Sequence, residues 1–465
     1  MLHFVQHDIN IKTTMKTTAN ILLFCFISFI ANAQYSVTTY AGNGSAGFTN
    51  GNAGSAKFNG PYGICMDKSE NLFIADGGNN CIRKITPAGV VSTYAGTGVA
   101  GYLDGTSSTA KFNSPFDLCA DDSGNVYVSD FSNHRIRKIS VNGTVSTIAG
   151  SGTAGYMDGT AGVARFDFPR GICIDKQGNL YIGDSWNHRI RKIDNMGNVT
   201  TYAGGGSSMG VSSPGSYVDA NDTSARFHTP TGLSIDKSGN IYVADAYNHR
   251  IRKINTSRVV TTYCGSGPTG VSNGGYADGS SSAAVFNTPT EVFSDSSGNL
   301  LIGDTFGNKV RKVDVSGNAT TIAGKDSSGF TNGAGNVAKF NYARGITSNF
   351  AGDKIYVVDF NNHAIRLITG LWNGVGELKW NPERKIEIYP NPASDHVTVL
   401  LKDFKDKTFK IFDLQGREVT KNVFTEGIKN ENNQIQIKLN LEKLAKGVYV
   451  IQFNDSNLSG RIIRE

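Results

Sequence analysis

The chain has few cysteines, few prolines and few charged residues, and it lacks a long apolar run. Of its 465 residues only 6 are cysteine and 11 are proline, and charged residues account for 18%. No Cys-x-x-Cys pair or Cys/His group has the spacing of a zinc site, so zinc is not indicated. The apolar run at 21–30 is too short to cross a bilayer as a helix. We therefore predict no transmembrane segment.

One short phrase, by contrast, occurs six times. Two of its copies read NVYVSDFSNHRIRKI from Asn125 and NIYVADAYNHRIRKI from Asn240. The six copies share an aspartate, each 54 to 61 residues before the next: Asp76, Asp130, Asp184, Asp245, Asp304 and Asp359. A period of this length indicates an array of repeated supersecondary units.

Each repeat contains four short runs with the composition of β-strands. In the second repeat these runs are 116–121, 125–130, 134–140 and 144–150. Val, Ile and Tyr fill the runs while Gly, Asn, Asp and Ser fill the gaps between them. Four strands per repeat predict one blade of an all-β propeller. We expect the Arg and Lys side chains of the third strand to keep their charged groups in water.

The two ends of the repeat region predict how the ring closes. The last copy, 345–369, has three runs and lacks the fourth, whereas residues 36–42 form such a strand without a blade of their own. The simplest interpretation is that 36–42 completes the sixth blade. The region 34–370 would then be a six-bladed propeller in which only short strand edges stay exposed.

The cysteines follow the repeat and do not suggest bridges. Cys65, Cys119 and Cys173 occupy the same position in the first strand of three successive blades. Equivalent positions on adjacent blades should be too far apart for a disulfide, which needs Cα atoms within about 7 Å. With Cys25 in the segment predicted to be removed, five cysteines remain, so at least one thiol is free. We interpret them as small buried apolar residues.

The phrase Asn-His-Arg-Ile-Arg-Lys-Ile, after a hydrophobic strand that ends in Asp, resembles the NHL repeat. That family forms β-propellers, commonly six-bladed, so the resemblance implies the same architecture for residues 36–369. The repeats in this chain are longer than the typical NHL unit, because a segment such as 96–115 joins one blade to the next. We expect these inserts to lie on the face that carries the Asp-x-x-Asn-His turns.

The N-terminal region resembles a secretory signal peptide. Met15-Lys16 precedes the apolar run, and Ala31-Asn32-Ala33 follows it as a cleavage site. We therefore expect residues 1–33 to be removed, with translation starting at Met15 and the mature chain beginning at Gln34. At the other end of the repeats the composition changes, and we interpret 371–384 as a linker.

Residues 385–465 form a small β-rich unit that we expect to be an immunoglobulin-like β-sandwich. Its Tyr-Pro-Asn-Pro at 389–392, its Asp-Leu-Gln-Gly-Arg turn at 413–417 and its Lys-Gly-Val-Tyr at 446–449 resemble the C-terminal sorting domain of the type IX secretion system of Bacteroidota. The resemblance implies passage through the periplasm, contact with the type IX machinery, and release or attachment at the cell surface. A plain sandwich without a sorting role is the alternative.

The repeated histidines and aspartates invite a metal or catalytic interpretation. His134, His188, His249 and His363 share one position, which Asn80 and Asn308 fill in the other two repeats. Because a catalytic residue breaks symmetry and a structural residue repeats, we expect each histidine to hydrogen-bond within its own blade. The repeated aspartates at the strand ends should accept N–H bonds in the following turn. The inserts offer one carboxylate each, such as Asp104, which is too few for calcium.

The positions just before and at the start of each first strand differ between repeats and should ring the top mouth of the central channel. These candidate ligand-binding residues are Tyr62, Phe116, Asp117, Arg170, Glu291 and Arg344, with Thr231 beside them. Two arginines, two acids and two aromatic residues around one axis could bind a small polar ligand. The alternative is ordinary variation at solvated loop positions.

Two classes of function remain open. The first is a binding scaffold with a protein or glycan partner on the top face, or a purely adhesive variant of it. The second is a metal-assisted lyase or hydrolase at the channel mouth, but the first strands contain no inward histidine, and Asp117 and Glu291 are the only acids at the mouth. We therefore predict no catalytic residue, metal or cofactor. The basic residues recur around the ring without forming a stripe, which argues against nucleic acid.

Overall fold

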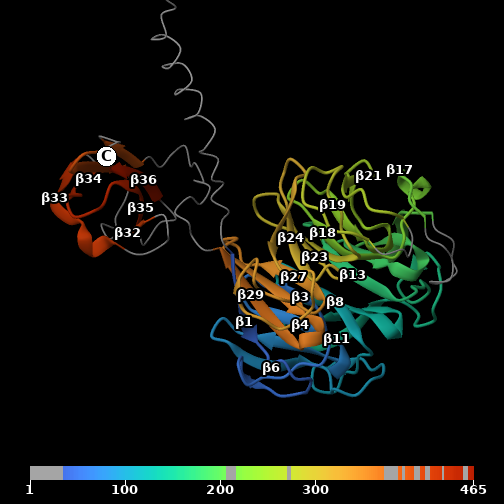
Figure 1. Ribbon diagram of the computed structural model, residues 1–465. Helices are drawn as coiled ribbons and strands as arrows, with labels where there is room; N and C mark the ends of the chain where they lie inside the picture. The colour runs from blue at the N-terminus through green and yellow to red at the C-terminus, as the bar shows by residue number, and fades with distance from the viewer. Residues whose placement is uncertain are drawn as a thin grey trace, which may run out of the picture. The chain divides into compact units, whose positions relative to one another are not determined.

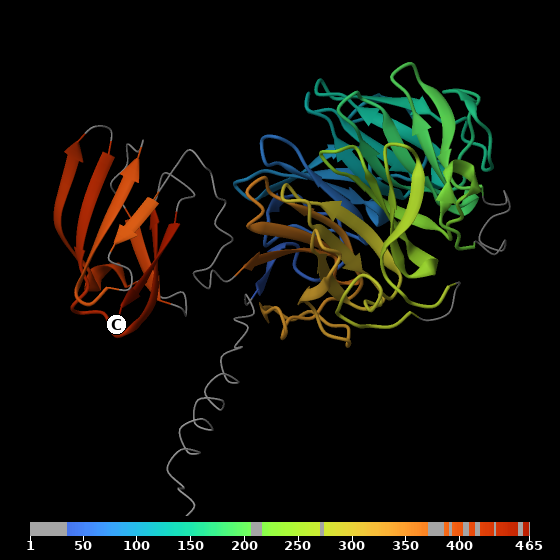
Figure 2. The same ribbon diagram turned by 90° about the horizontal axis from the view of Figure 1, so that it is seen from above.

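The computed structural model describes two compact units of the chain, Tyr35–Gly370 and a C-terminal unit (Figures 1 and 2). The described residues are 35–205, 216–269, 274–370, 386–389, 393–402, 409–413, 419–431, 434–453 and 459–464. The predicted signal peptide at 1–33 and the predicted linker at 371–384 lie outside them. Every regular element in these residues is a β-strand or a short 3-10 turn, and none is a helix that could cross a membrane.

The described part of 35–370 forms six antiparallel sheets. From the innermost strand outward, the first is β3 (Pro61–Met66), β4 (Leu72–Asp76), β5 (Cys81–Ile85), β6 (Val90–Ala95) and β2 (Gly51–Asn52). The second is β8 (Pro115–Ala120), β9 (Val126–Asp130), β10 (Arg135–Ile139), β11 (Thr144–Ala149) and β7 (Gly105–Thr106). The third is β13 (Pro169–Ile174), β14 (Leu180–Asp184), β15 (Arg189–Ile193), β16 (Asn198–Ala203) and β12 (Gly159–Thr160).

The remaining three sheets have the same strand order from the inside outward, and among the described residues the fifth lacks the outermost strand. The fourth is β18 (Pro230–Ile235), β19 (Ile241–Asp245), β20 (Arg250–Ile254), β21 (Val259–Cys264) and β17 (Ala220–Asn221). The fifth is β22 (Pro289–Ser294), β23 (Leu300–Asp304), β24 (Lys309–Val313) and β25 (Ala319–Ala323). The sixth is β27 (Ala343–Ser348), β28 (Lys354–Asp359), β29 (Ala364–Gly370), β1 (Tyr35–Ala41) and β26 (Gly333–Ala334).

The inner strands make the six sheets into a closed ring around a channel. Each inner strand contacts the next in the order β3, β8, β13, β18, β22 and β27, and β27 contacts β3 again. Figure 1 shows these strands gathered around the centre of the unit. The ring closes as the sequence predicts, because β1 pairs with β29 in the last sheet, with Val37 opposite Ile368. The chain is therefore an all-β propeller closed by its N-terminal strand.

The long inserts add a strand that the sequence analysis did not predict. In five of the six sheets a two-residue strand from the insert pairs with the outer edge, as Gly105 pairs with Val145 in the second sheet. An isolated bridge between Leu103 and Lys111 closes the base of the same insert. Strands of two residues are too short to leave a period in the sequence, which is why the inserts appeared to be plain loops.

The most prominent buried groups are six arginines, one per sheet. The prediction that third-strand arginines keep their charged groups in water is wrong for these residues, which are fully buried: Arg83, Arg137, Arg191, Arg252, Arg311 and Arg366. In the second sheet Arg137 Nη1 donates to Asp130 Oδ2 at 2.7 Å, and both side chains are fully buried. Each of the six arginines forms the same pair with the aspartate that ends the second strand.

Each buried arginine also fixes the insert of its own sheet. Arg137 donates to the carbonyl oxygens of Lys111 and Leu103, at 3.0 and 2.9 Å. Its guanidinium carbon lies 5.0 Å from the ring centroids of both Tyr102 and Phe112, so the charged plane is held between two aromatic rings. The second ring belongs to a set of phenylalanines that are all fully buried: Phe58, Phe112, Phe166, Phe227, Phe286 and Phe340.

Side-chain oxygens of the insert also accept hydrogen bonds from these arginines. Asp104 Oδ1 lies 2.7 Å from Arg137 Nη2, and Asn50 and Asn332 accept from the equivalent arginines of the first and sixth sheets. The aspartate that ends the second strand accepts a backbone N–H from the end of the insert, 17 residues earlier, as Asp130 does from Asn113 at 2.8 Å. The same aspartate also bonds to the following turn, but through the side chain of Asn133, whose Nδ2 donates to Asp130 Oδ2 at 2.8 Å, and not through the backbone N–H that was predicted.

The histidines connect neighbouring sheets, which corrects the prediction that they bond within their own sheet. His363 Nδ1 of the sixth sheet accepts the N–H of Gly60 at 3.0 Å, and this bond spans the closure of the ring. The same bond is made by the other three histidines and by the two asparagines at that position. Burial lowers the pKa of His363 below its usual value, which favours the neutral ring that can accept.

We predict that the ring-closing bond of His363 tolerates asparagine but not alanine. His363→Ala leaves the Gly60 N–H without its acceptor, so the free energy of unfolding should fall by about 1–2 kcal/mol. His363→Asn should stay within about 0.5 kcal/mol of the parent chain, because Asn80 and Asn308 accept the same bond elsewhere in the ring. Urea unfolding of the mature chain measures both variants. Equal losses for alanine and asparagine would show that the acceptor role is wrong.

The five cysteines of the described residues are all free thiols, as expected. Cys81, Cys173 and Cys264 are buried, while Cys65 and Cys119 are partly buried. Burial raises the pKa of Cys264 to about 11, so this thiol stays protonated at neutral pH. The cysteines therefore act as small core residues.

The C-terminal unit consists of two antiparallel sheets that share one core. The first is β30 (Ile386–Tyr389), β31 (His396–Lys402), β34 (Gln434–Asn440) and β33 (Phe424–Glu431), and the second is β32 (Phe409–Asp413), β35 (Gly447–Phe453) and β36 (Ser459–Arg464). Val399 and Ile437 of the first sheet and Ile451 of the second belong to the same buried cluster. Most of the motif at 389–392 and of the turn at 413–417 lies outside the described residues.

Candidate functional site

The predicted site residues lie in two consecutive rings at the start of the inner strands. The second residues of these strands form the upper ring, made of Tyr62, Phe116, Arg170, Thr231, Thr290 and Arg344. The third residues form the lower ring, made of Gly63, Asp117, Gly171, Gly232, Glu291 and Gly345. Because the six strands follow one another in a closed circle, the two arginines face each other across the channel. The two acids do the same one layer below.

A continuous row of aromatic rings runs along the upper ring and the turns beside it. In order, its members are Phe360, Tyr62, Phe116, Phe131, Phe168 and Trp186. Successive ring centroids are 4.0 to 5.5 Å apart, and the row extends from the sixth sheet through the first and second to the third. All six side chains are only partly buried. We call this set the aromatic row.

The sequence analysis found two members of the aromatic row and missed four. Phe131, Trp186 and Phe360 occupy turn positions after the second strand, and Phe168 precedes an inner strand. These positions vary between repeats, since Gly77 stands where Phe131 and Phe360 stand in other sheets. That variation was a usable signal, because the aspartate before the turn is the same in all six repeats.

Local backbone geometry makes room for the row and supports it. A Cβ atom on Gly77 would lie 2.4 Å from the ring of Tyr62, so only glycine allows that ring to lie across the turn. At the other end Phe168 has φ near +50°, which is strained for a bulky residue and costs roughly 1–3 kcal/mol. His134 supports Phe168, because its Nδ1 accepts the Phe168 N–H at 3.1 Å and the two rings are 4.5 Å apart.

The two arginines of the upper ring lie against the aromatic row. The guanidinium carbon of Arg170 is 5.3 Å from the ring centroid of Phe116, and that of Arg344 is 4.9 Å from the centroid of Tyr62 and 4.2 Å from that of Phe360. The rings therefore hold both guanidinium groups in place at the channel mouth.

Neither of these guanidinium groups has a polar partner among the residues that the structure describes. No hydrogen bond or ion pair joins either group to another described residue, and the Nε atom of each is buried without an acceptor. Burial, together with repulsion from Arg344, lowers the pKa of Arg170 to about 10. Arg170 is thus charged at neutral pH, and no described acid forms an ion pair with either arginine. This distinguishes them from the six core arginines, each of which has its own aspartate.

The two acids of the lower ring are buried beneath the arginines. Asp117 is 5% and Glu291 is 8% exposed. The N–H of Ile172 on the next inner strand donates to Asp117 Oδ2 at 3.1 Å. A Cβ atom on Gly63 would lie 2.4 Å from Asp117 Oδ1, and one on Gly232 would lie 2.2 Å from Glu291 Oε1. The glycines of the lower ring therefore leave the space that the two acids fill.

Burial also changes how these acids titrate. It raises the pKa of Asp117 to about 7, and burial together with the charge of Asp117 raises the pKa of Glu291 well above its usual value. Protonated carboxyl groups are poor metal ligands. Across the ranges that the structure describes, no group of three or more His, Cys, Asp or Glu side chains is placed to hold a metal ion.

We predict that Asp117→Asn stabilises the propeller at high pH only. The folded-state pKa of about 7 lies above the usual 3.8, so the native protein binds the proton more tightly than the unfolded chain does. Asp117 therefore lowers stability progressively as the pH rises from about 4 to 7. Removing the charge should raise the free energy of unfolding on the order of 2 kcal/mol at pH 8 and change it little at pH 4. Thermal unfolding across this pH range measures the difference, and a gain independent of pH would contradict the assignment.

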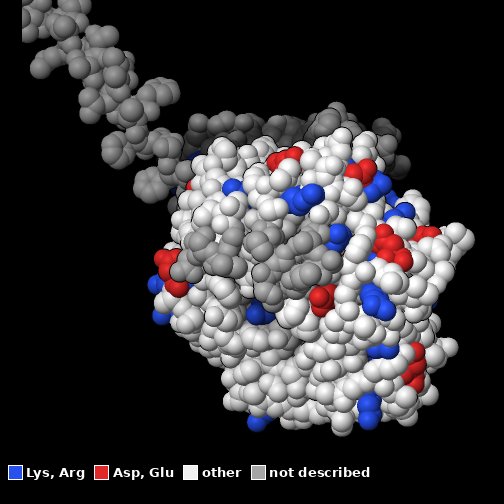
Figure 3. Space-filling model, turned by 90° about the vertical axis from the view of Figure 1, so that its right-hand side faces the viewer, with Lys and Arg blue, Asp and Glu red and all other residues white. Residues whose placement is uncertain are grey.

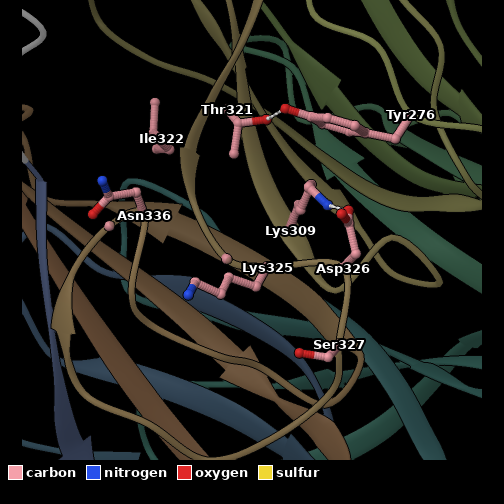
Figure 4. A pocket seen from close by; sticks show the side chains of 10 residues that line it. Tyr276, Lys309, Thr321, Ile322, Lys325, Asp326, Ser327 and Asn336 are labelled. Carbon is pink, nitrogen blue, oxygen red and sulfur yellow. Dashed lines mark hydrogen bonds and ion pairs between the residues drawn. The ribbon is translucent and has the colours of Figure 1, made fainter.

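A separate groove lies outside the channel, beside the insert that follows the fifth sheet. It has a volume of about 570 Å³, and Lys309, Tyr276 and Asn336 are among its lining residues (Figure 4). Two pairs of its polar side chains bond to each other, since Tyr276 Oη lies 2.9 Å from Thr321 Oγ1 and Lys309 pairs with Asp326. None of the lining residues belongs to an inner strand, so this groove is not part of the candidate site.

The net charge of +6 does not gather into one patch on the face shown in Figure 3. Lysine and arginine side chains are scattered there among acidic side chains and a largely uncharged surface. A protein that binds the phosphate backbone of nucleic acid usually needs a continuous basic stripe. No such stripe crosses the described part of this face.

Family models identify both parts of the chain. The NHL repeat model matches residues 112–139, 166–193, 227–254 and 340–366, and the model described as a secretion system C-terminal sorting domain matches 387–464. The chain therefore carries NHL repeats followed by a type IX sorting domain, as the sequence resemblances predicted. A domain of this kind directs export through type IX secretion to the cell surface or beyond it.

The curated relatives share the repeats over part of their length. The chain is 29% identical over 286 residues to Protein SUPPRESSOR OF QUENCHING 1, chloroplastic, of Arabidopsis thaliana, an alignment of 59% of this chain and 26% of that protein. It is 28% identical over 339 residues to NHL repeat-containing protein 2 of Homo sapiens, covering 66% and 46%. The chain thus spans less than half the length of these relatives.

Two solved structures of similar fold come from Bacteroides thetaiotaomicron. A structural genomics protein of unknown function from Bacteroides thetaiotaomicron superposes with a TM-score of 0.54 at 19% identity, covering 72% of this chain and 76% of that one. An auxiliary nutrient binding protein of the same organism has a TM-score of 0.54 at 16% identity, with the same coverage. At these identities the likeness shows the propeller fold alone.

Proposed function

We propose that this protein is an exported binding protein that holds an anionic ligand at the mouth of its propeller channel. The observation that carries the proposal is the pair Arg170 and Arg344, which face each other without a polar partner among the described residues. An unpaired charge in a partly buried place is unfavourable, and a carboxylate, sulfate or phosphate between the two groups would satisfy both.

The surroundings of the two arginines favour binding over a purely structural role. The aromatic rings beside them fix the guanidinium groups before any ligand arrives, and this lowers the entropy lost on binding. The two positive charges repel each other across the channel, and an anion placed between them would relieve that repulsion. Each of the six core arginines has an aspartate partner, as Arg137 does, and these two have none among the described residues.

The export of the protein indicates where its ligand would be found. The sorting domain places the propeller at or outside the cell surface, so its ligand would be an extracellular acid, free or part of a larger molecule. The fold does not decide this role, because propellers serve many functions and the site must be argued from its own residues.

The enzyme alternative has weaker support. A metal-assisted lyase or hydrolase at the mouth would need ligands that point to the axis from several sheets. Asp117 and Glu291 are the acids of the two rings, and burial favours their protonated forms. Two positive charges above them would also repel a metal ion.

We predict that the double variant Arg170→Ala/Arg344→Ala loses anion binding and keeps its fold. Titration calorimetry of the mature chain with D-galacturonate should show binding by the parent that weakens at least about tenfold in the variant, since two charge-assisted bonds are lost. Arg189→Ala is the matched control, because Arg189 also lies over an aromatic ring, 3.9 Å from the centroid of Tyr156, but outside the mouth. Unchanged affinity in the double variant, with a normal melting temperature, would refute the proposal.

A further inference from the structure

The aromatic row reaches well beyond the two arginines. Phe168 and Trp186 lie at its far end, beside the third sheet, and among the described residues neither ring has a cation–π contact with Arg170 or Arg344. A small acid held between the guanidinium groups would leave these two rings unused. Six partly exposed aromatic rings in contact with one another, across four sheets, form a surface that fits a longer ligand.

The aromatic rings of the row favour a ligand whose own rings have apolar faces and polar edges. Aromatic faces carry partial negative charge and attract the polarised C–H groups on the face of a sugar ring, while hydroxyl groups stay in water. This inference rests on the proposed function, which places a carboxylate between the arginines. The aromatic row would then bind the sugars that are attached to that carboxylate. Stacking of this kind tolerates variation in the sugar.

We propose that the aromatic row binds the sugar rings of an acidic oligosaccharide whose carboxylate lies between Arg170 and Arg344. A single-stranded nucleic acid would also stack on aromatic rings, but it needs a basic track along its backbone. Arg344 lies over Tyr62 and Phe360, and Arg170 lies over Phe116 and Phe131, and two such groups do not form a continuous track. An acidic peptide is the other class that the test must separate.

The aromatic row contains a tryptophan whose fluorescence can report ligand binding. Trp186 is the one tryptophan of residues 34–370, since the other two of the chain are Trp372 and Trp380. In the mature chain with Trp372→Phe and Trp380→Phe, the fluorescence of Trp186 should change when trigalacturonate binds along the row. D-galacturonate, which is too short to lie along the row as far as Phe168 and Trp186, should bind between the arginines with a much smaller change.

The deciding variant is Phe168→Ser, because Ser114 has the same left-handed backbone at the equivalent position of the second sheet, with φ near +50°. We expect it to weaken trigalacturonate binding about 3- to 10-fold, the loss of one stacking partner, and to leave D-galacturonate binding unchanged. Phe306→Ala is the matched control, because Phe306 is 44% exposed at the turn position of the fifth sheet that Trp186 occupies in the third. It should change neither affinity.

The outcomes separate this inference from the proposed function. If the double arginine variant weakens both ligands while Phe168→Ser weakens neither, the anion site stands and the sugar track is wrong. If the double arginine variant binds both ligands normally, the anion site itself is wrong. Equal binding of fully methyl-esterified trigalacturonate, or tighter Phe168-dependent binding of a triaspartate peptide, would overturn the acidic oligosaccharide.

Discussion

The propeller depends on one repeated interaction, the buried ion pair between a third-strand arginine and the aspartate that ends the second strand. Removing two such charges from water is expensive, and the pair is favourable only where its remaining donors and acceptors are satisfied. In each sheet the terminal nitrogens of the arginine also bond to the insert, as those of Arg137 do with Leu103 and Lys111. The Nε atom has a partner in the second and third sheets and none among the described residues of the other four. Strand, turn and insert are therefore held by a single guanidinium between two aromatic rings.

This arrangement explains why the turn face is rigid enough to carry a site. The aspartate fixes the turn, the residue after the turn bonds to the next sheet, and the residue it bonds to precedes the next inner strand. Positions outside this network are free to vary from sheet to sheet. The aromatic row and the two upper arginines occupy those free positions, so the binding surface can change without disturbing the six-fold framework.

The features of the fold that could be predicted are those that recur at a regular spacing in the sequence. The spacing of the shared aspartates predicted the repeated sheets, and the unpaired strand at 36–42 predicted the closure that β1 makes. The buried state of Arg137 could not be read from its strand, because an Arg-x-Arg pattern also fits an exposed edge. The bond from His363 to Gly60 joins residues 303 positions apart, and no local pattern reports such a contact.

The candidate site was predicted in part for the same reason. Comparing equivalent positions picked out Arg170 and Arg344, which stand at the same place in different repeats. It could not show that Asp117 and Glu291 lie one layer deeper, because burial at the centre of the ring depends on how the neighbouring glycines pack. It also stopped at the inner strands, and so missed Trp186 and Phe168, which reach the row from a turn and a connection.

The most direct test of the account is to locate an anion in the mouth. Crystals of the mature chain soaked in sodium selenate would reveal bound anions by anomalous diffraction at the selenium edge. The account predicts a selenium peak on the channel axis between the guanidinium groups of Arg170 and Arg344. Peaks at surface lysines and arginines, with none between these two residues, would contradict it.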